Sequence, residues 1–92
     1  MLKIDMPTEP ANRGIGDGSL PKLLENTLSK LKPESAYFCP YDGVRTAMIF
    51  LDLADVADIP AILEPLFLGL DAEVEVIPVM NIDDLRKGLA AI

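Results

Sequence analysis

The sequence predicts a small α+β fold with the elements in the order strand, helix, strand, strand, helix, strand and a short final helix. Three observations predict it. Short segments have alternating or continuous apolar residues, two longer segments have apolar residues three and four positions apart, and turn signals separate them. This is the split βαβ order, in which right-handed crossovers place both long helices on one face of a four-stranded antiparallel sheet. For 92 residues, one domain (residues 1–92) is expected.

The first third of the chain predicts a strand, a loop and a helix. Residues 2–6 alternate apolar and charged side chains, as a strand with one buried face does. Residues 7–18 contain two prolines and three glycines, so we expect a loop there. Ser19 can cap the helix that follows, in which leucines recur at helical spacing until Pro33 ends it.

The middle of the chain predicts a hairpin. Residues 36–40 and 44–53 are two strands on either side of Asp42-Gly43, a pair that favours the positive φ angles of tight turns. The second strand is continuously apolar from residue 47 to residue 51, which predicts a central strand covered on both faces.

The last third predicts a helix, an edge strand and a short helix. The first of these helices begins at Asp55 or Asp58 and repeats apolar residues at helical spacing. Residues 72–80 read as the last strand, which Pro78 assigns to a sheet edge because it has no amide to donate. Asn81 is a suitable cap for the final helix.

Charge and cysteine content exclude several classes of protein. The net charge is −7, from 8 Lys plus Arg against 15 Asp plus Glu, and the cations are scattered. Nucleic acids and anionic membranes bind clustered cations, so neither is an expected partner. Cys39 is the only cysteine, which excludes an intrachain disulfide, and we expect it to be a small buried apolar residue. No stretch is typical of an export signal, which favours a cytoplasmic location.

The predicted sheet has one face without helices. The central and last strands are expected to present apolar residues there, and a small monomer seldom exposes such a patch. The simplest cover is the same face of a second copy, related by a two-fold axis. We therefore expect a homodimer formed through the open sheet face.

Residues 64–67 (EPLF), 73–80 (EVEVIPVM) and 83–85 (DDL) resemble a set of short bacterial proteins. The element order resembles the dimeric α/β-barrel superfamily, in which two ferredoxin-like subunits press their sheets together. The resemblance implies a ferredoxin-like βαββαβ fold with an additional C-terminal helix and a cleft between helices and sheet. Many haem-handling members of this superfamily use a histidine as ligand, and this sequence contains no histidine. We therefore carry over no catalytic residue from the resemblance.

Four residues are candidates for binding a small molecule. Tyr37, Tyr41 and Arg45 cluster around the predicted hairpin, where they can line a pocket. Tyrosines at strand ends are equally expected from packing with a hydrated hydroxyl. Arg13 is the fourth candidate, because its cation can attract an anion to the neighbouring glycines.

Those glycines precede a helix start. Gly14, Gly16, Gly18 and Ser19 can present backbone amides to an anion, assisted by the helix dipole. The spacing does not match a known phosphate loop, and a flexible loop is the alternative.

Two groups of carboxylates can be explained by local structure without a metal site or a catalytic role. Hard cations such as Mg²⁺ or Ca²⁺ bind carboxylate oxygens, which are available at Asp52, Asp55 and Asp58. Helix capping already explains two of these three residues. Glu73 and Glu75 can act as an acid and a base, although such a pair is more typical of a solvated edge strand. We expect no metal and no cofactor.

Two functions remain open at this point. The first is a homodimeric module without catalysis that binds a small molecule or a protein. The alternative is a cofactor-free enzyme, of isomerase or monooxygenase type, that acts on a small organic acid or polyketide-like substrate. The enzyme alternative rests on fold resemblance alone.

Overall fold

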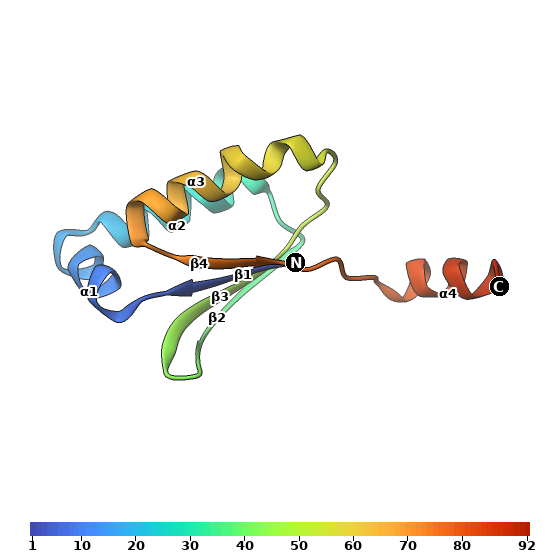
Figure 1. Cartoon of the computed structure of the whole chain (residues 1–92), viewed down its shortest axis with the longest axis horizontal. Coiled ribbons are helices and arrows are strands. Elements are labelled where there is room, and N and C mark those ends of the chain that lie inside the picture. The colour runs from blue at the N-terminus through green and yellow to red at the C-terminus, as the bar shows by residue number, and fades with distance from the viewer.

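The computed structural model describes all 92 residues and has an α+β fold of four strands and four helices (Figure 1). In chain order the elements are β1 (Leu2–Met6), α1 (Thr8–Asp17), α2 (Ser19–Leu31), β2 (Ser35–Tyr41), β3 (Val44–Phe50), the 3-10 turn η1 (Val56–Asp58), α3 (Ile59–Leu70), β4 (Glu73–Val76) and α4 (Ile82–Ala90). None of the helices is both long enough and apolar enough to cross a membrane.

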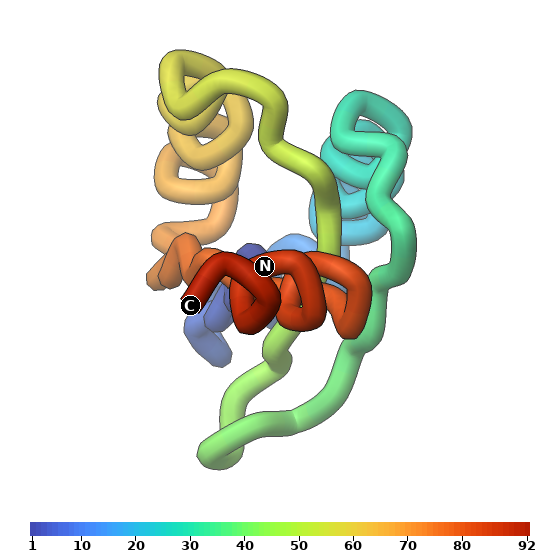
Figure 2. The backbone as a smooth tube through the Cα atoms, turned by 90° about the vertical axis from the view of Figure 1, so that its right-hand side faces the viewer, coloured from blue at the N-terminus to red at the C-terminus, as the bar shows by residue number.

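The four strands form one antiparallel sheet in the order β2-β3-β1-β4. β3 lies between β2 and β1, so the first βαβ unit is split as predicted. Asp42 and Gly43 both have positive φ, 51° and 80°, which confirms the predicted tight turn between β2 and β3. α2 and α3 cover the same face of the sheet (Figure 1), and Figure 2 shows them as two separate columns above it.

The core lies between that covered face and the helices. The alternation in β1 turns Leu2, Ile4 and Met6 toward the helices, and all three are buried. Ile49 of β3 and Leu66 of α3 are fully buried beside them. The alternating apolar residues of β1 therefore fill the core as expected.

The expectation of a loop at residues 7–18 is wrong, because this segment is helix α1. Its proline at position 10 sits in the first turn, where no intrahelical amide bond is lost. Gly14 is buried against α2: a Cβ there would stand 2.8 Å from the Cβ of Leu20. Gly18, with φ 80°, ends α1 in the left-handed conformation that glycine adopts readily. Packing against α2 thus outweighs the low helix propensity of the glycines.

The last strand is shorter than predicted. β4 ends at Val76, and the backbones of Met1 and Ile77 then exchange two hydrogen bonds of 2.8 and 2.7 Å. Beyond Pro78 the chain leaves the sheet and continues into α4, which projects away from the body (Figure 1). The predicted cap is confirmed, since Asn81 Oδ1 accepts a hydrogen bond of 2.8 Å from the amide of Asp84.

Candidate functional site

An open groove with a volume of about 550 Å³ lies between α2 and α3. We call it the helix groove. The second half of α2, the segment after β3 and the first half of α3 form its walls. Its main apolar residues are Leu23, Leu31, Leu51, Leu53, Ile62 and Pro65. The volume lies within the range of about 300–1,000 Å³ that is typical of ligand pockets.

The polar groups of the helix groove lie among apolar ones and include a single cation. Thr27 is already paired, because its hydroxyl donates a 2.8 Å hydrogen bond to the carbonyl of Leu23. Lys30 is the only cation among the lining residues, and Asp52 and Asp58 are the anions. The groove therefore suits a ligand that is mainly apolar and carries few charges.

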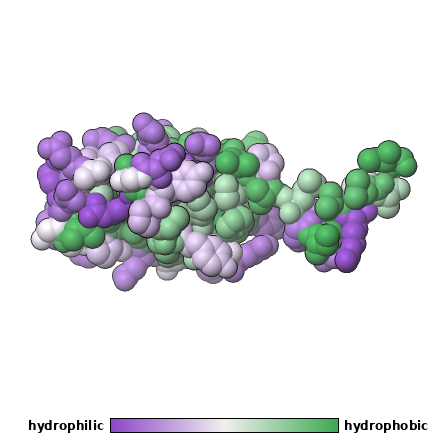
Figure 3. All heavy atoms as spheres, turned by 90° about the horizontal axis from the view of Figure 1, so that it is seen from below, coloured by the Kyte–Doolittle hydropathy of each residue, from purple (hydrophilic) through white to green (hydrophobic).

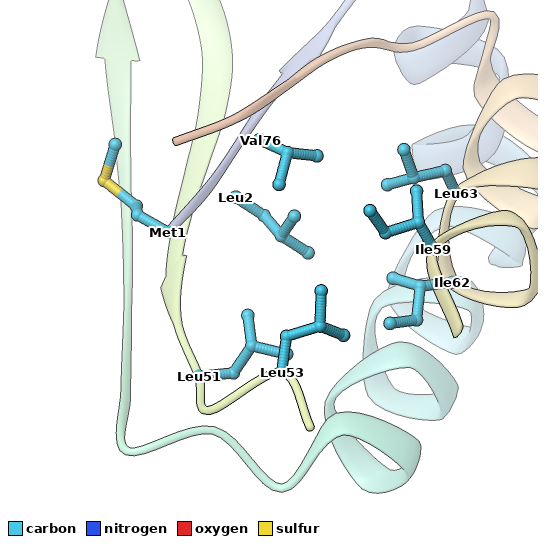
Figure 4. A pocket seen from close by; sticks show the side chains of 8 residues that line it. All are labelled: Met1, Leu2, Leu51, Leu53, Ile59, Ile62, Leu63 and Val76. Carbon is cyan, nitrogen blue, oxygen red and sulfur yellow. The ribbon is translucent and has the colours of Figure 1, made fainter. Parts of the chain in front are cut away.

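A smaller cavity of about 40 Å³ adjoins the helix groove, and all eight residues that line it are hydrophobic. We call it the end cavity. Figure 4 shows Leu2 and Val76 of the sheet facing Ile59 and Leu63 of α3 across it, while Met1 points away. The two cavities share the residues Leu51, Leu53 and Ile62. Together they form one apolar surface at the end of the sheet from which α4 departs.

The open face of the sheet has a charged half on β1 and β4. Lys3 Nζ lies 3.1 Å from Asp5 Oδ1 and 3.9 Å from Glu75 Oε1, and 4.7 Å from the ring centre of Tyr41. The hydrogen bond to Asp5 raises the pKa of the Lys3 ammonium. Glu73 and Glu75 occupy the face on which apolar residues of the last strand were expected, so that expectation is wrong. The pairing of β4 with β1 turns its valines toward the helices instead.

The other half of the open face, on β2 and β3, is aromatic. Tyr37 is 64% exposed, and its ring stands edge-on to that of Phe50 at 6.4 Å between centres. Met48 pairs with Tyr37 across the strands and is half-buried. Cys39 is exposed on this face, so the expectation that it is buried is wrong. Figure 3 views the molecule from this side, where apolar atoms extend toward the base of α4.

The four candidate ligand residues do not form one site. Tyr37 and Tyr41 lie on the open face. Arg45 lies on the covered face, opposite Met6, and its Nη1 donates a 2.9 Å hydrogen bond to Asn12 Oδ1 of α1. Arg13 is exposed on α1. None of the four lines the helix groove or the end cavity.

The glycine segment does not form the predicted anion loop. Gly14 and Gly16 lie inside α1, and Gly18 joins α1 to α2. The amide of Ser19 donates a 2.8 Å hydrogen bond to Asp17 Oδ1. The side chain of Ser19 and then its amide lower the pKa of the Asp17 carboxyl by hydrogen bonding. A carboxylate of the chain itself therefore occupies the start of α2, where a bound anion was expected.

The aspartates after β3 were considered as cation ligands and as helix caps. Asp55 Oδ1 accepts a 2.9 Å hydrogen bond from the amide of Ala57, which confirms its predicted capping role at η1. The side chain of Asp58 makes no hydrogen bond to the first turn of α3, so the prediction that Asp58 caps this helix is wrong. No three residues among the cysteine, the aspartates and the glutamates of the chain lie close enough together to hold a metal ion.

No protein-family model matches the sequence, and neither a curated protein nor a solved structure matches the chain. A cleft beside the helices was expected from the resemblance alone, and none of the residues that line the helix groove was predicted as a ligand residue. The available signal was the apolar residues Leu51 and Leu53, which continue past the end of β3 into a segment with no regular structure.

Proposed function

We propose that the chain is a non-catalytic binding module that works as a homodimer and takes an apolar ligand into the helix groove. The observation that carries the proposal is the groove itself, with its volume of about 550 Å³ and its apolar walls. The strand order β2-β3-β1-β4 supports a ferredoxin-like fold of the dimeric α/β-barrel kind. The alternative, a cofactor-free enzyme of isomerase or monooxygenase type, gains no support from the candidate ligand residues, because Tyr37 and Arg45 lie on opposite faces of the sheet.

A change at Ala61 tests the groove. Ala61 lines it from α3, and the sequence contains no tryptophan. We expect Ala61→Trp to fill the groove and to weaken binding of the neutral apolar dye Nile red at least about tenfold, which corresponds to about 1.4 kcal/mol. Fluorescence titration of the dye measures the change.

The matched control for Ala61→Trp is Leu68→Trp, also on α3, at a position that is 83% exposed and does not line the groove. This variant is expected to bind the dye as the unchanged chain does. Equal dye affinity in both tryptophan variants would reject the helix groove as a ligand site.

The homodimer is proposed to form through the open sheet face. The aromatic half of that face, with Tyr37 and Phe50, supports it, because aromatic side chains are enriched at protein interfaces. A two-fold axis would stack this half on a second sheet about 10 Å away.

The single thiol of the chain reports on this contact. Cys39 lies exposed on the open face. We expect a maleimide reagent to label it at least about tenfold more slowly at high protein concentration, where dimers dominate, than at high dilution. A labelling rate that is independent of protein concentration would contradict pairing through this face.

A further inference from the structure

We propose that the ligand of the helix groove is α4 of a second copy of this chain, so that two chains exchange their C-terminal segments. We call residues 78–92 the arm. This inference rests on the proposed binding function of the groove and names its partner.

The arm carries an apolar stripe that is largely exposed. Ile82, Leu85 and Leu89 recur three and four residues apart, and they are 57%, 39% and 57% exposed. No residue of α4 is buried. Figure 3 shows apolar atoms along one side of this helix and polar atoms along the other. α4 has only nine residues, and isolated helices shorter than about 12–15 residues are marginal in water. A stable α4 therefore needs a surface on which to pack its stripe.

The chain directs the arm away from its own groove. Two backbone hydrogen bonds tie Ile77 to Met1, and Pro78 restricts Ile77 to an extended conformation. To reach the groove of its own chain, the arm would have to reverse its direction between Pro78 and Asn81. That stretch contains no glycine, and it continues outward from β4 (Figure 1). The arm is thus positioned to reach another molecule.

The helix groove and the end cavity match the arm in character. Leu51, Leu53 and Ile62 are common to both cavities and offer a continuous apolar surface to the stripe. At about 1.5 Å per residue, α4 is roughly 14 Å long. Gly88 lies next to the stripe and has no side chain to hold the two backbones apart.

The charges beside these apolar surfaces are complementary. The groove has Asp52 and Asp58 among its lining residues, and Arg86, four residues after Ile82, flanks the stripe on α4. Arg86 makes one exposed contact of its own, 3.7 Å to Asp83. Docking would place this cation of the arm near the aspartates of the groove.

A second copy is the partner that fits because each chain carries both complementary parts. A two-fold axis uses each part twice and so doubles the buried area. Stable protein interfaces bury about 1,200–2,000 Å² in total, more than one short helix on one groove supplies. Reciprocal exchange of two arms brings the contact toward that range.

The test compares two variants of the full chain by light scattering. Leu85→Ser with Leu89→Ser removes the stripe. Asp83→Ser with Ala90→Ser introduces two serines on the other side of α4. We expect the first variant to have half the molar mass of the unchanged chain, because association through the arm is weakened at least about 100-fold while pairs held by the open sheet face remain. We expect the second variant to keep the full mass. Far-ultraviolet circular dichroism checks that the sheet domain stays folded.

Mixing two variants tests which surfaces meet. The stripe variant keeps its groove and lacks a functional arm, whereas Ala61→Trp keeps its arm and has a filled groove. We expect each alone to lose the arm contact and their mixture to regain it as an assembly with twice the mass of either variant alone, visible by native mass spectrometry. An unchanged mass in the stripe variant, or no doubling of mass in the mixture, would overturn arm exchange. Loss of Nile red binding in Ala61→Trp would still support the groove in that case, so the two proposals fail separately.

Discussion

Leu66→Ala is expected to destabilise the fold by about 2–5 kcal/mol. Leu66 lies in the middle of α3 and is 0% exposed, and it is among the largest fully buried side chains together with Ile4 and Ile49. Shortening it removes apolar contacts at the centre of the core and leaves a cavity that the sheet cannot fill. Equilibrium unfolding in urea, followed by circular dichroism, measures the loss.

The control for Leu66→Ala lies two residues further along the same helix. Leu68 is 83% exposed, so Leu68→Ala should change the free energy of unfolding by no more than about 0.5 kcal/mol. Similar losses in the two variants would mean that α3 does not face the sheet in the way described.

Gly14→Ala is expected to destabilise the protein by about 1–3 kcal/mol, even though alanine is the better helix former. The new Cβ would lie 2.8 Å from the Cβ of Leu20, which is itself 3% exposed. α1 and α2 would have to move apart, and the buried contact between them would be lost. Thermal unfolding and urea unfolding both report the change.

Gly16→Ala is the matched control, in the same helix and one half-turn away. No atom lies within 4 Å of a Cβ at this position, so helix propensity alone decides and the variant should gain about 0.5–1 kcal/mol. If both substitutions stabilised the protein, α1 would not pack on α2 through Gly14.

The elements with a clear apolar period could be predicted from the sequence. The leucines of α2, the alternation in β1 and the Asp42-Gly43 turn each favour a single local structure, and the structure has all three. α1 could not be predicted in this way, because its glycines and prolines favour a loop. Their helical conformation depends on the contact of Gly14 with Leu20, which lies in the next helix.

The candidate ligand residues were chosen for their side-chain chemistry and their position near the hairpin. The sheet face on which each one lies was not considered, and they lie apart in the structure. A two-residue turn pairs Tyr41 with Val44 and Pro40 with Arg45, so Tyr41 and Arg45 point to opposite faces. This consequence of the hairpin register could have been derived from the sequence. The helix groove could not, because its width depends on how far apart α2 and α3 pack on the sheet.

The open sheet face and the arm are each proposed to bind a second copy, so self-association is the central claim. Light scattering of the unchanged chain in neutral buffer, over a dilution series, measures it most directly. We predict a molar mass of at least two chains of 10.0 kDa each. A constant mass of one chain at every concentration would contradict the assembly through both surfaces.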